Sequence, residues 1–248
     1  MSISSKIKYL SGISTIAALG LVIVSWAAPP DVPDFTEYEA GTERKQAFIN
    51  YFLPLIEERN ASILEAREQL IEWSEARDDI GWWDRFQLDD LVETYRIEDF
   101  DVNSDEHWAT LLRRVDAIPI SLALAQAANE SGWGTSRFGR DGYNYFGQWC
   151  YTEGCGIVPG KRGKGEVHEV AAFNSPEDSV ASYLRNLNSH KAYRPMRDIR
   201  ARLRAAEKPI TGIELARGLG KYSQRGDAYI EELHSIIRRN DLLQHDID

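Results

Sequence analysis

Cysteine is scarce in this chain: only Cys150 and Cys155 occur among 248 residues. Zinc sites that use thiolates need several cysteines and histidines together, and here the nearest histidine, His168, stands alone. We therefore expect no metal and no other cofactor. In an exported chain, the spacing Cys-Tyr-Thr-Glu-Gly-Cys favours a disulfide that closes a tight loop.

An excess of positive charge is also missing, because 29 Lys and Arg face 39 Asp and Glu, for a formal net charge of −10. Nucleic-acid binding requires a basic surface, so we expect no nucleic-acid partner. The charge is uneven, however. Residues 31–105 are rich in Asp and Glu, whereas basic residues dominate residues 161–239. The basic half could tolerate an anionic polymer or could simply be solvated, and we interpret its run 194–204 as a solvated helix.

Long hydrophobic runs are absent except near the N-terminus, where residues 13–24 are almost wholly apolar. Lys6 and Lys8 precede this run, and Ser25 and Ala27 follow it as the small residues that a signal peptidase requires. The pattern is typical of a secretory signal.

A slightly longer segment, residues 9–28, could instead span a bilayer as an uncleaved anchor. Residues 1–28 are therefore expected to be a signal peptide or a membrane anchor. In both cases the rest of the chain reaches the periplasm or cell envelope, and the anchor would attach it to the inner membrane. Three prolines within residues 29–41 predict a linker.

Residues 42–115 have the pattern of a helical N-terminal region. Apolar residues recur at helical spacing over 42–75, and Pro54 is expected to kink or restart that helix. We expect a turn at 78–86, with Trp82 and Trp83 packed, and a helix at 88–95. A capping box led by Asn103 predicts a further helix to about residue 115.

Residues 116–243 predict a second region. Pro119 opens a helix at 120–131 that Gly132 and Gly134 end. A glycine-rich stretch at about 139–173 indicates a small β-hairpin lobe. Ser175 and Pro176 begin another helix. The remaining helices are expected at 175–189, 194–206, 213–219 and 227–239. The predicted fold is mostly α: a lysozyme-like α+β architecture with a small β-hairpin lobe and an N-terminal helical extension.

Glu130 is the strongest candidate for chemistry. It lies in the last turn of an Ala- and Leu-rich helix, where the partial negative charge of the helix end disfavours a carboxylate. Ala123 and Ala127, at helical spacing, also favour the neutral acid. The glycines that follow allow a substrate to approach closely. A carboxyl group that stays protonated near neutral pH is the general acid that glycosidic bond cleavage needs. The alternative is an exposed glutamate near a helix end.

The segment Gln126-Ala-Ala-Asn-Glu-Ser-Gly-Trp-Gly-Thr-Ser136, followed by Asn144-Tyr-Phe-Gly147, resembles the N-acetylglucosaminidase family, glycoside hydrolase family 73. This family is also called the mannosyl-glycoprotein endo-β-N-acetylglucosaminidase-like domain. Its pattern is a helix ending in Glu-Ser-Gly-x-Gly-x-Ser, then Asn-Leu-Phe-Gly, with tyrosine replacing leucine here. The segment from Tyr222 to Tyr229 is similar to its Tyr-Ala-x-Asp-x-x-Tyr motif. The cysteine loop and helical extension resemble the Bax-type branch of Gram-negative bacteria.

This resemblance implies an exported glycoside hydrolase. The combined motif is specific, because several elements occur in the right order.

 The expected activity is cleavage of the β-1,4 bond after N-acetylglucosamine in peptidoglycan, with glycan strands as the partner and a monomeric enzyme. A lytic transglycosylase, which also uses one glutamate after a helix, is the alternative enzyme. A non-catalytic cell-wall-binding protein is the alternative outside enzymes.

Carried over residue by residue, the resemblance makes Glu130 the general acid and places Tyr222 near the reacting sugar. A second acidic residue is expected in the β lobe, where Glu166 is preferred to Glu169 because Glu169 shares its strand face with Phe173. Substrate-assisted chemistry would need no second carboxylate. Sugar binding requires flat aromatic faces and polar edges. The expected substrate-binding residues are Trp149, Gln148, Tyr145, Asn144 and Trp133, with Phe146 in the core.

Overall fold

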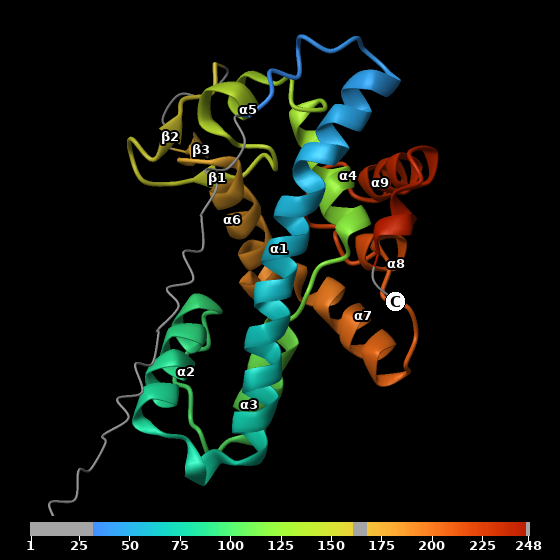
Figure 1. The fold of residues 1–248 in the computed structure, drawn as a ribbon. Helices are drawn as coiled ribbons and strands as arrows, with labels where there is room; N and C mark the ends of the chain where they lie inside the picture. The colour runs from blue at the N-terminus through green and yellow to red at the C-terminus, as the bar shows by residue number, and fades with distance from the viewer. Residues whose placement is uncertain (1–31, 161–167, 247–248) are drawn as a thin grey trace, which may run out of the picture. The chain divides into compact units, whose positions relative to one another are not determined.

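A long helix organises the chain in the computed structural model, which describes residues 32–160 and 168–246. Helix α1 (Thr42–Glu75) packs against α3 (Asp105–Arg114), α4 (Ile120–Ser131) and α6 (Pro176–Ser189), as Figure 1 shows. Its buried stripe includes Phe48, Phe52 and Ile56. Because this stripe is packed on both sides of Pro54, the helix continues through the proline, and the predicted restart is wrong.

Helix α2 (Trp82–Thr94) begins inside the segment where we expected a turn. Trp82 and Trp83 are 80% and 56% exposed, so the prediction that they pack is wrong. They contact each other edge to face instead, with ring centroids 5.4 Å apart. The cap of α3 is also one residue from its predicted place. The side chain of Ser104, not that of Asn103, accepts a hydrogen bond from the His107 amide.

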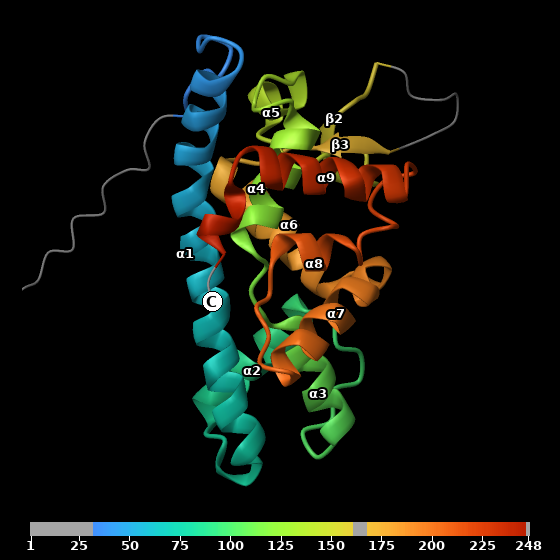
Figure 2. The ribbon, with the colours of Figure 1, turned by 90° about the vertical axis from the view of Figure 1, so that its right-hand side faces the viewer.

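Helix α4 occupies the centre of the core. It lies between α1 on one side and α8 (Gly212–Ala216) and α9 (Asp227–Arg239) on the other (Figures 1 and 2). Every residue from Ile120 to Ala128 is buried, which explains why this helix is made of small and aliphatic residues. Gly132 ends it in the left-handed conformation, with φ of 58°, as predicted from the sequence.

The β lobe is a three-stranded antiparallel sheet rather than a hairpin. Its strands are β1 (Trp149–Cys150), β2 (Gly156–Ile157) and β3 (Glu169–Ala171), in the order β1-β3-β2. Cys150 pairs with Glu169, and Ile157 pairs with Val170. The short helix α5 (Arg137–Gly142) contacts β2. The disulfide Cys150–Cys155 is confirmed and joins β1 to the turn that leads into β2.

Helix α7 (Arg194–Ala205) carries the basic run that we interpreted as solvated. That interpretation is wrong for two of its five arginines, because Arg197 and Arg200 are buried. Arg200 donates hydrogen bonds to three backbone carbonyls, those of Arg113, Asp116 and Ala117. Its guanidinium also lies 3.5 Å from the buried Asp116 carboxylate. Part of the predicted basic surface is therefore an interior ion cluster.

The fold class is confirmed: a mostly helical body with one small antiparallel sheet. None of the helices in the described residues is both long enough and apolar enough to cross a bilayer. The predicted signal peptide or anchor, residues 1–28, lies outside the described residues, as do the first three residues of the predicted linker.

Candidate active site

Glu130 is placed where the central helix meets the small sheet. It occupies the last turn of α4, two residues before the left-handed Gly132. A Cβ atom added to Gly147 would lie 3.1 Å from the Glu130 Oε2 atom. Gly147 also has φ of +62°, a conformation that favours glycine. The Asn144–Gly147 motif therefore ends in glycine because the backbone must turn sharply against the carboxyl group.

The environment of Glu130 favours its neutral form. Burial raises the pKa of this carboxyl above its ordinary value, and hydrogen bonds from Tyr229 and Asn129 offset part of that rise. The two side chains that hydrogen-bond to this carboxyl group, Tyr229 and Asn129, carry no charge. A carboxyl group with a raised pKa can hold its proton nearer to neutral pH, which a general acid requires.

A directed chain of hydrogen bonds leads to the carboxyl group. The Tyr183 hydroxyl donates to Gln126 Oε1 over 2.6 Å, and Gln126 Nε2 donates to the Tyr229 oxygen over 2.9 Å. The Tyr229 hydroxyl then donates to Glu130 Oε1 over 2.8 Å. Because Gln126 already donates to the Tyr229 oxygen, the Tyr229 proton is directed to the carboxyl group. Tyr229 can thus stabilise the carboxylate that remains after Glu130 gives up its proton.

Glu130 lies in a cleft of about 560 Å³. The cleft is formed by the end of α4, the turn into β1, β1 itself, α6 and the Tyr222 loop, and one residue comes from the segment after α2. Polar and aromatic side chains dominate it, as sugar binding requires. Its lining residues are Arg96, Glu130, Phe146, Gly147, Gln148, Trp149, Tyr151, Ser182, Arg185, Asn186, His190, Tyr193, Tyr222 and Ser223.

Three of the predicted site residues join Glu130 in this cleft. Trp149 is half exposed, so its ring is open to a ligand, and its edge-to-face contact with His168 fixes its position. Gln148 is held by Ser182, which donates to its Oε1 over 3.0 Å. Tyr222 stacks on Tyr229 at an interplanar angle of 7°, and its hydroxyl donates to the Phe146 carbonyl over 2.8 Å. The Tyr222 ring lines the cleft, but its hydroxyl proton is directed to the backbone.

Three other predicted residues do not line this cleft. Tyr145 is 1% exposed and packs edge to face on Phe52 in the core. Asn144 is 2% exposed, and its amide donates to the carbonyls of Gln148 and Ala171, which fixes the turn. Trp133 packs against Phe48 of α1. All three pack within the segments that hold the site, and their role in sugar binding stays a prediction.

The second carboxylate expected in the β lobe is not placed by the structure. Glu166 lies outside the described residues and stays a prediction. Glu169 is buried, and its carboxylate accepts hydrogen bonds from the amides of Gly154 and Gly156. Glu169 therefore closes the cysteine loop from inside the sheet. In agreement with our preference, it is not available to a substrate.

Several residues around Glu130 were not predicted from the sequence. Tyr229 was visible only as the last residue of the Tyr222–Tyr229 motif, and Gln126 as the residue one helical turn before Glu130. Tyr183, Tyr193 and Arg96 carried no local signal. Their positions depend on how α6, the segment before α7 and the end of α2 pack around the cleft, and such long-range packing has no short sequence signature.

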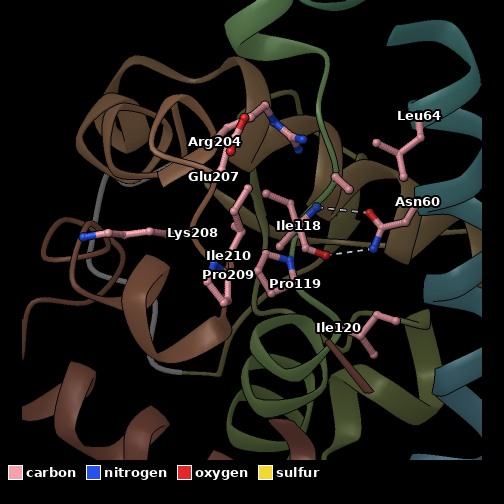
Figure 3. Close-up of a pocket in the computed structure, with 11 residues that line it drawn as sticks. Asn60, Leu64, Ile118, Pro119, Ile120, Arg204, Glu207, Lys208, Pro209 and Ile210 are labelled. Atoms are coloured by element: carbon pink, nitrogen blue, oxygen red, sulfur yellow. Dashed lines mark hydrogen bonds between the residues drawn. The ribbon is translucent and has the colours of Figure 1, made fainter. Parts of the chain in front are cut away.

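A second cavity, of about 580 Å³, lies elsewhere and has a different character. Its wall is largely apolar, with Ile118, Pro119, Ile120 and Ile210 (Figure 3). There Asn60 of α1 donates to the Ile118 carbonyl and accepts from the Ile118 amide, as the dashed lines show. This cavity contains none of the residues around Glu130. We interpret it as a gap in the packing between α1, the segment that leads into α4 and the segment that follows α7.

The one group in the described residues with the spacing of a metal site consists of Cys150, Cys155 and Glu169. The two sulfur atoms are joined in the disulfide, so neither is available as a thiolate ligand. The Glu169 carboxylate is already occupied by two backbone amides. These residues serve the sheet and do not suit a metal ion.

A carboxyl group with a raised pKa, in a polar cleft between a helical body and a small sheet, defines a glycosidase-type site. Comparison with known proteins gives the family. Residues 105–242 match the glucosaminidase family, described as mannosyl-glycoprotein endo-beta-N-acetylglucosaminidase. The chain belongs to this family and is a glycoside hydrolase.

Two known proteins are similar to the chain. Protein bax of Escherichia coli K12 is 36% identical over 223 residues, which cover 88% of this chain and 77% of that protein. The catalytic domain of the autolysin Auto from Listeria monocytogenes aligns in structure with a TM-score of 0.41 and 19% identity, over 85% of this chain and 92% of that domain.

Proposed function

We propose that the chain is an exported endo-β-N-acetylglucosaminidase that hydrolyses the β-1,4 bond after N-acetylglucosamine in peptidoglycan. The observation that carries the proposal is the Glu130 carboxyl group, which burial keeps closer to its neutral form at the wall of a polar cleft. The exposed Trp149 ring offers a flat apolar face for a sugar, and Gln148, Ser182 and Asn186 offer polar groups for its hydroxyls and N-acetyl group.

In the proposed reaction, Glu130 transfers its proton to the glycosidic oxygen as the bond to the N-acetylglucosamine C1 atom breaks. Tyr229 donates a hydrogen bond to the carboxylate that forms. A water molecule adds to C1 and releases a proton, so the products are a reducing N-acetylglucosamine end and a new hydroxyl on the next sugar. Glu166 stays the sequence-based candidate for the carboxylate that assists this water.

Export is part of the proposal. Its support is the basic and then apolar N-terminal sequence, together with the Cys150–Cys155 disulfide, which an oxidising compartment allows. The site of action would be the periplasm or cell envelope, with or without an inner-membrane anchor. Fractionation of cells, with detection of the N-terminal residues in the mature protein, tests both points.

Digestion of purified peptidoglycan by the wild-type protein and by Glu130→Gln tests the activity. We expect reducing N-acetylglucosamine ends from the wild type and a rate about 10²–10⁴-fold lower for the variant, because a general acid typically contributes that factor. Mass spectrometry identifies the ends. Glu231→Gln, an exposed carboxylate on α9 outside the cleft lining, is the matched control.

Two outcomes contradict the proposal. Anhydro-muramic ends in place of reducing ends would make the protein a lytic transglycosylase. Absence of products from the wild type would leave a wall-binding protein whose retention on peptidoglycan depends on Trp149 and not on Glu130.

A further inference from the structure

Basic residues gather along one part of the cleft. Arg96, from the segment after α2, and Arg185, from α6, both line it and are exposed. His190 lines it too, and its pKa is lowered by burial and by the positive charge of Arg96. No carboxylate in the described part of the chain forms an ion pair with Arg96 or Arg185. The two guanidinium groups are therefore open to an anion from solution.

The rest of the described cleft wall does not neutralise these cations. Glu130 is the only carboxylate among its lining residues, and its raised pKa disfavours the charged form. His190 Nδ1 accepts a hydrogen bond from the Ala192 amide, so the neutral imidazole has its proton on Nε2 and remains a donor. The cleft is thus positive and rich in donors in a protein whose net charge is −10.

Arg96 occupies a backbone position that usually belongs to glycine. The Arg96 amide donates to the Glu93 carbonyl, and the Ile97 amide donates to the Val92 carbonyl. This pair of hydrogen bonds is the Schellman motif that ends helices, and Arg96 is its left-handed residue, with φ of 58°. A side chain with a Cβ atom is disfavoured there. Such residues persist where the surrounding structure over-determines them, often at binding sites.

The turn around Arg96 is fixed to the rest of the protein. Arg114, at the end of α3, donates to the carbonyls of both Tyr95 and Arg96, over 2.7 and 2.6 Å. Tyr95 is buried. The backbone that carries Arg96 is therefore held from two sides, so the Arg96 side chain starts from a defined point on the cleft wall. Little conformational freedom of the backbone remains to be lost when a ligand binds.

We propose that Arg96 and Arg185 bind a carboxylate on the substrate, so that the enzyme prefers glycan strands whose peptide side chains carry free carboxylates. This inference rests on the proposed function, because it names the chemistry of the substrate at the same cleft. Guanidinium groups suit the role, since they bind carboxylates with two parallel hydrogen bonds. Arg96 lies before residue 105, where the family match begins. The N-terminal helical region thus contributes a specificity-determining residue to the active site.

Binding of two forms of one substrate tests the proposal. Soluble peptidoglycan strands with free carboxylates are compared with the same strands after carbodiimide coupling to ammonia, which converts the carboxylates to amides. Affinities are measured by calorimetry with Glu130→Gln, which retains the cleft and is not expected to turn over. We expect the free-carboxylate form to bind about three- to tenfold more tightly at low salt, a range that follows from partly exposed ion pairs. The preference should shrink as salt is added.

Two variants in the Glu130→Gln background assign the preference to residues. Arg96→Gly should remove most of it while the protein unfolds at an equal or higher urea concentration, because glycine suits the left-handed turn. Arg185→Ala should remove part of it. Glu207→Gly is the matched control. It has the same type of backbone conformation, with φ of 51°, and lies outside the cleft lining, so it should leave the preference unchanged.

The outcomes separate this inference from the proposed function. Equal affinity for the two forms, or a preference that survives Arg96→Gly and Arg185→Ala, would contradict the carboxylate site even if the wild type hydrolyses peptidoglycan. Lack of measurable binding to either form would contradict it as well. Hydrolysis assays on the wild type, run in parallel, report on the proposed function alone.

Discussion

Two opposing effects act on the protonation state of the Glu130 carboxyl group. Burial favours the neutral acid, whereas the Tyr229 hydroxyl favours the carboxylate. A general acid uses both, because it must hold its proton before the bond breaks and release it as the bond breaks. The balance between these influences sets the pH range of the enzyme.

Tyr229→Phe should move the high-pH limit of activity upward. The variant loses the hydrogen bond that lowers the Glu130 pKa, so the pKa rises and the protonated acid persists to higher pH. The rate should fall at all pH values, because the carboxylate formed in the reaction loses its donor. The dependence of kcat/KM on pH measures both effects.

Tyr222→Phe makes the matched comparison, because Tyr222 stacks on Tyr229 but donates to the Phe146 carbonyl. It should leave the high-pH limit in place whatever it does to the rate. A shift of equal size in both variants would show that the Tyr229 hydroxyl has no special role.

Glu130→Gln should stabilise the folded protein at neutral pH. The folded-state pKa of Glu130 lies above its ordinary value of 4.5, so the folded chain binds this proton more tightly than the unfolded chain. The wild type therefore loses stability as pH rises from about 4.5 through the folded-state pKa. Glutamine has no such loss. Urea unfolding should show the variant more stable at pH 7 and the difference vanishing below pH 4; a variant less stable at pH 7 would contradict this.

At the scale of elements, the helices were the most predictable part. Pro119 and Gly132 bracket α4, and Ser175 with Pro176 begins α6, so local capping chemistry marks their ends. The order of the strands could not be predicted, because the pairing of β3 with both β1 and β2 depends on residues far apart in sequence. The start of α2 was missed because Trp82 and Trp83 suggest burial, and nothing local shows that they face solvent.

Like the fold, the site could be predicted only where local sequence signals mark its residues. Glu130 and Trp149 follow from motif and composition. Tyr145 and Trp149 are both aromatic and only four residues apart, yet one packs in the core and the other lines the cleft. Gly147, between them, has a left-handed backbone conformation, which changes the course of the chain. Which ring faces a ligand is therefore decided by a backbone angle that the residue types alone do not specify.

The disulfide should matter mostly to the β lobe. Replacing Cys150 and Cys155 by serine opens a six-residue loop, which the loop-entropy relation values at about 2 kcal/mol. We expect faster amide hydrogen exchange in β1 and β2 and a raised KM, because β1 carries Trp149. The helices should keep their protection. As the chain has only two cysteines, a reductant on the wild type should reproduce the effect. Unchanged exchange in the sheet would contradict this role.

At the scale of the whole molecule, Asp116 connects α7 to α1. Its carboxylate accepts two hydrogen bonds from Arg204 of α7, over 2.6 and 3.0 Å, and lies 3.5 Å from Arg200. Arg67 of α1 is 3.9 Å away. Burial lowers the pKa of Arg200 to about 10, an effect that the nearby Asp116 charge opposes. The N-terminal helical region and the family domain therefore share one buried ion cluster.

Asp116→Ala should be strongly destabilising, by about 3–5 kcal/mol, because it leaves buried guanidinium groups without their counter-charge. Urea unfolding measures the loss. Asp198→Ala is the matched control, since Asp198 pairs with Arg113 and Arg194 at the surface and should cost less than about 1 kcal/mol. Similar losses for both variants would show that the cluster contributes little.

The strand order of the β lobe has a consequence for how the protein is made. The central strand, β3, is the last of the three to leave the ribosome, so β1 and β2 cannot complete their ladders until residue 171 has emerged. Until then, each presents unpaired backbone edges to other chains. A nascent chain arrested before β3 would contain the Glu130 helix but would lack the finished wall that holds Trp149. The cleft around Glu130 is therefore completed late in the synthesis of the chain.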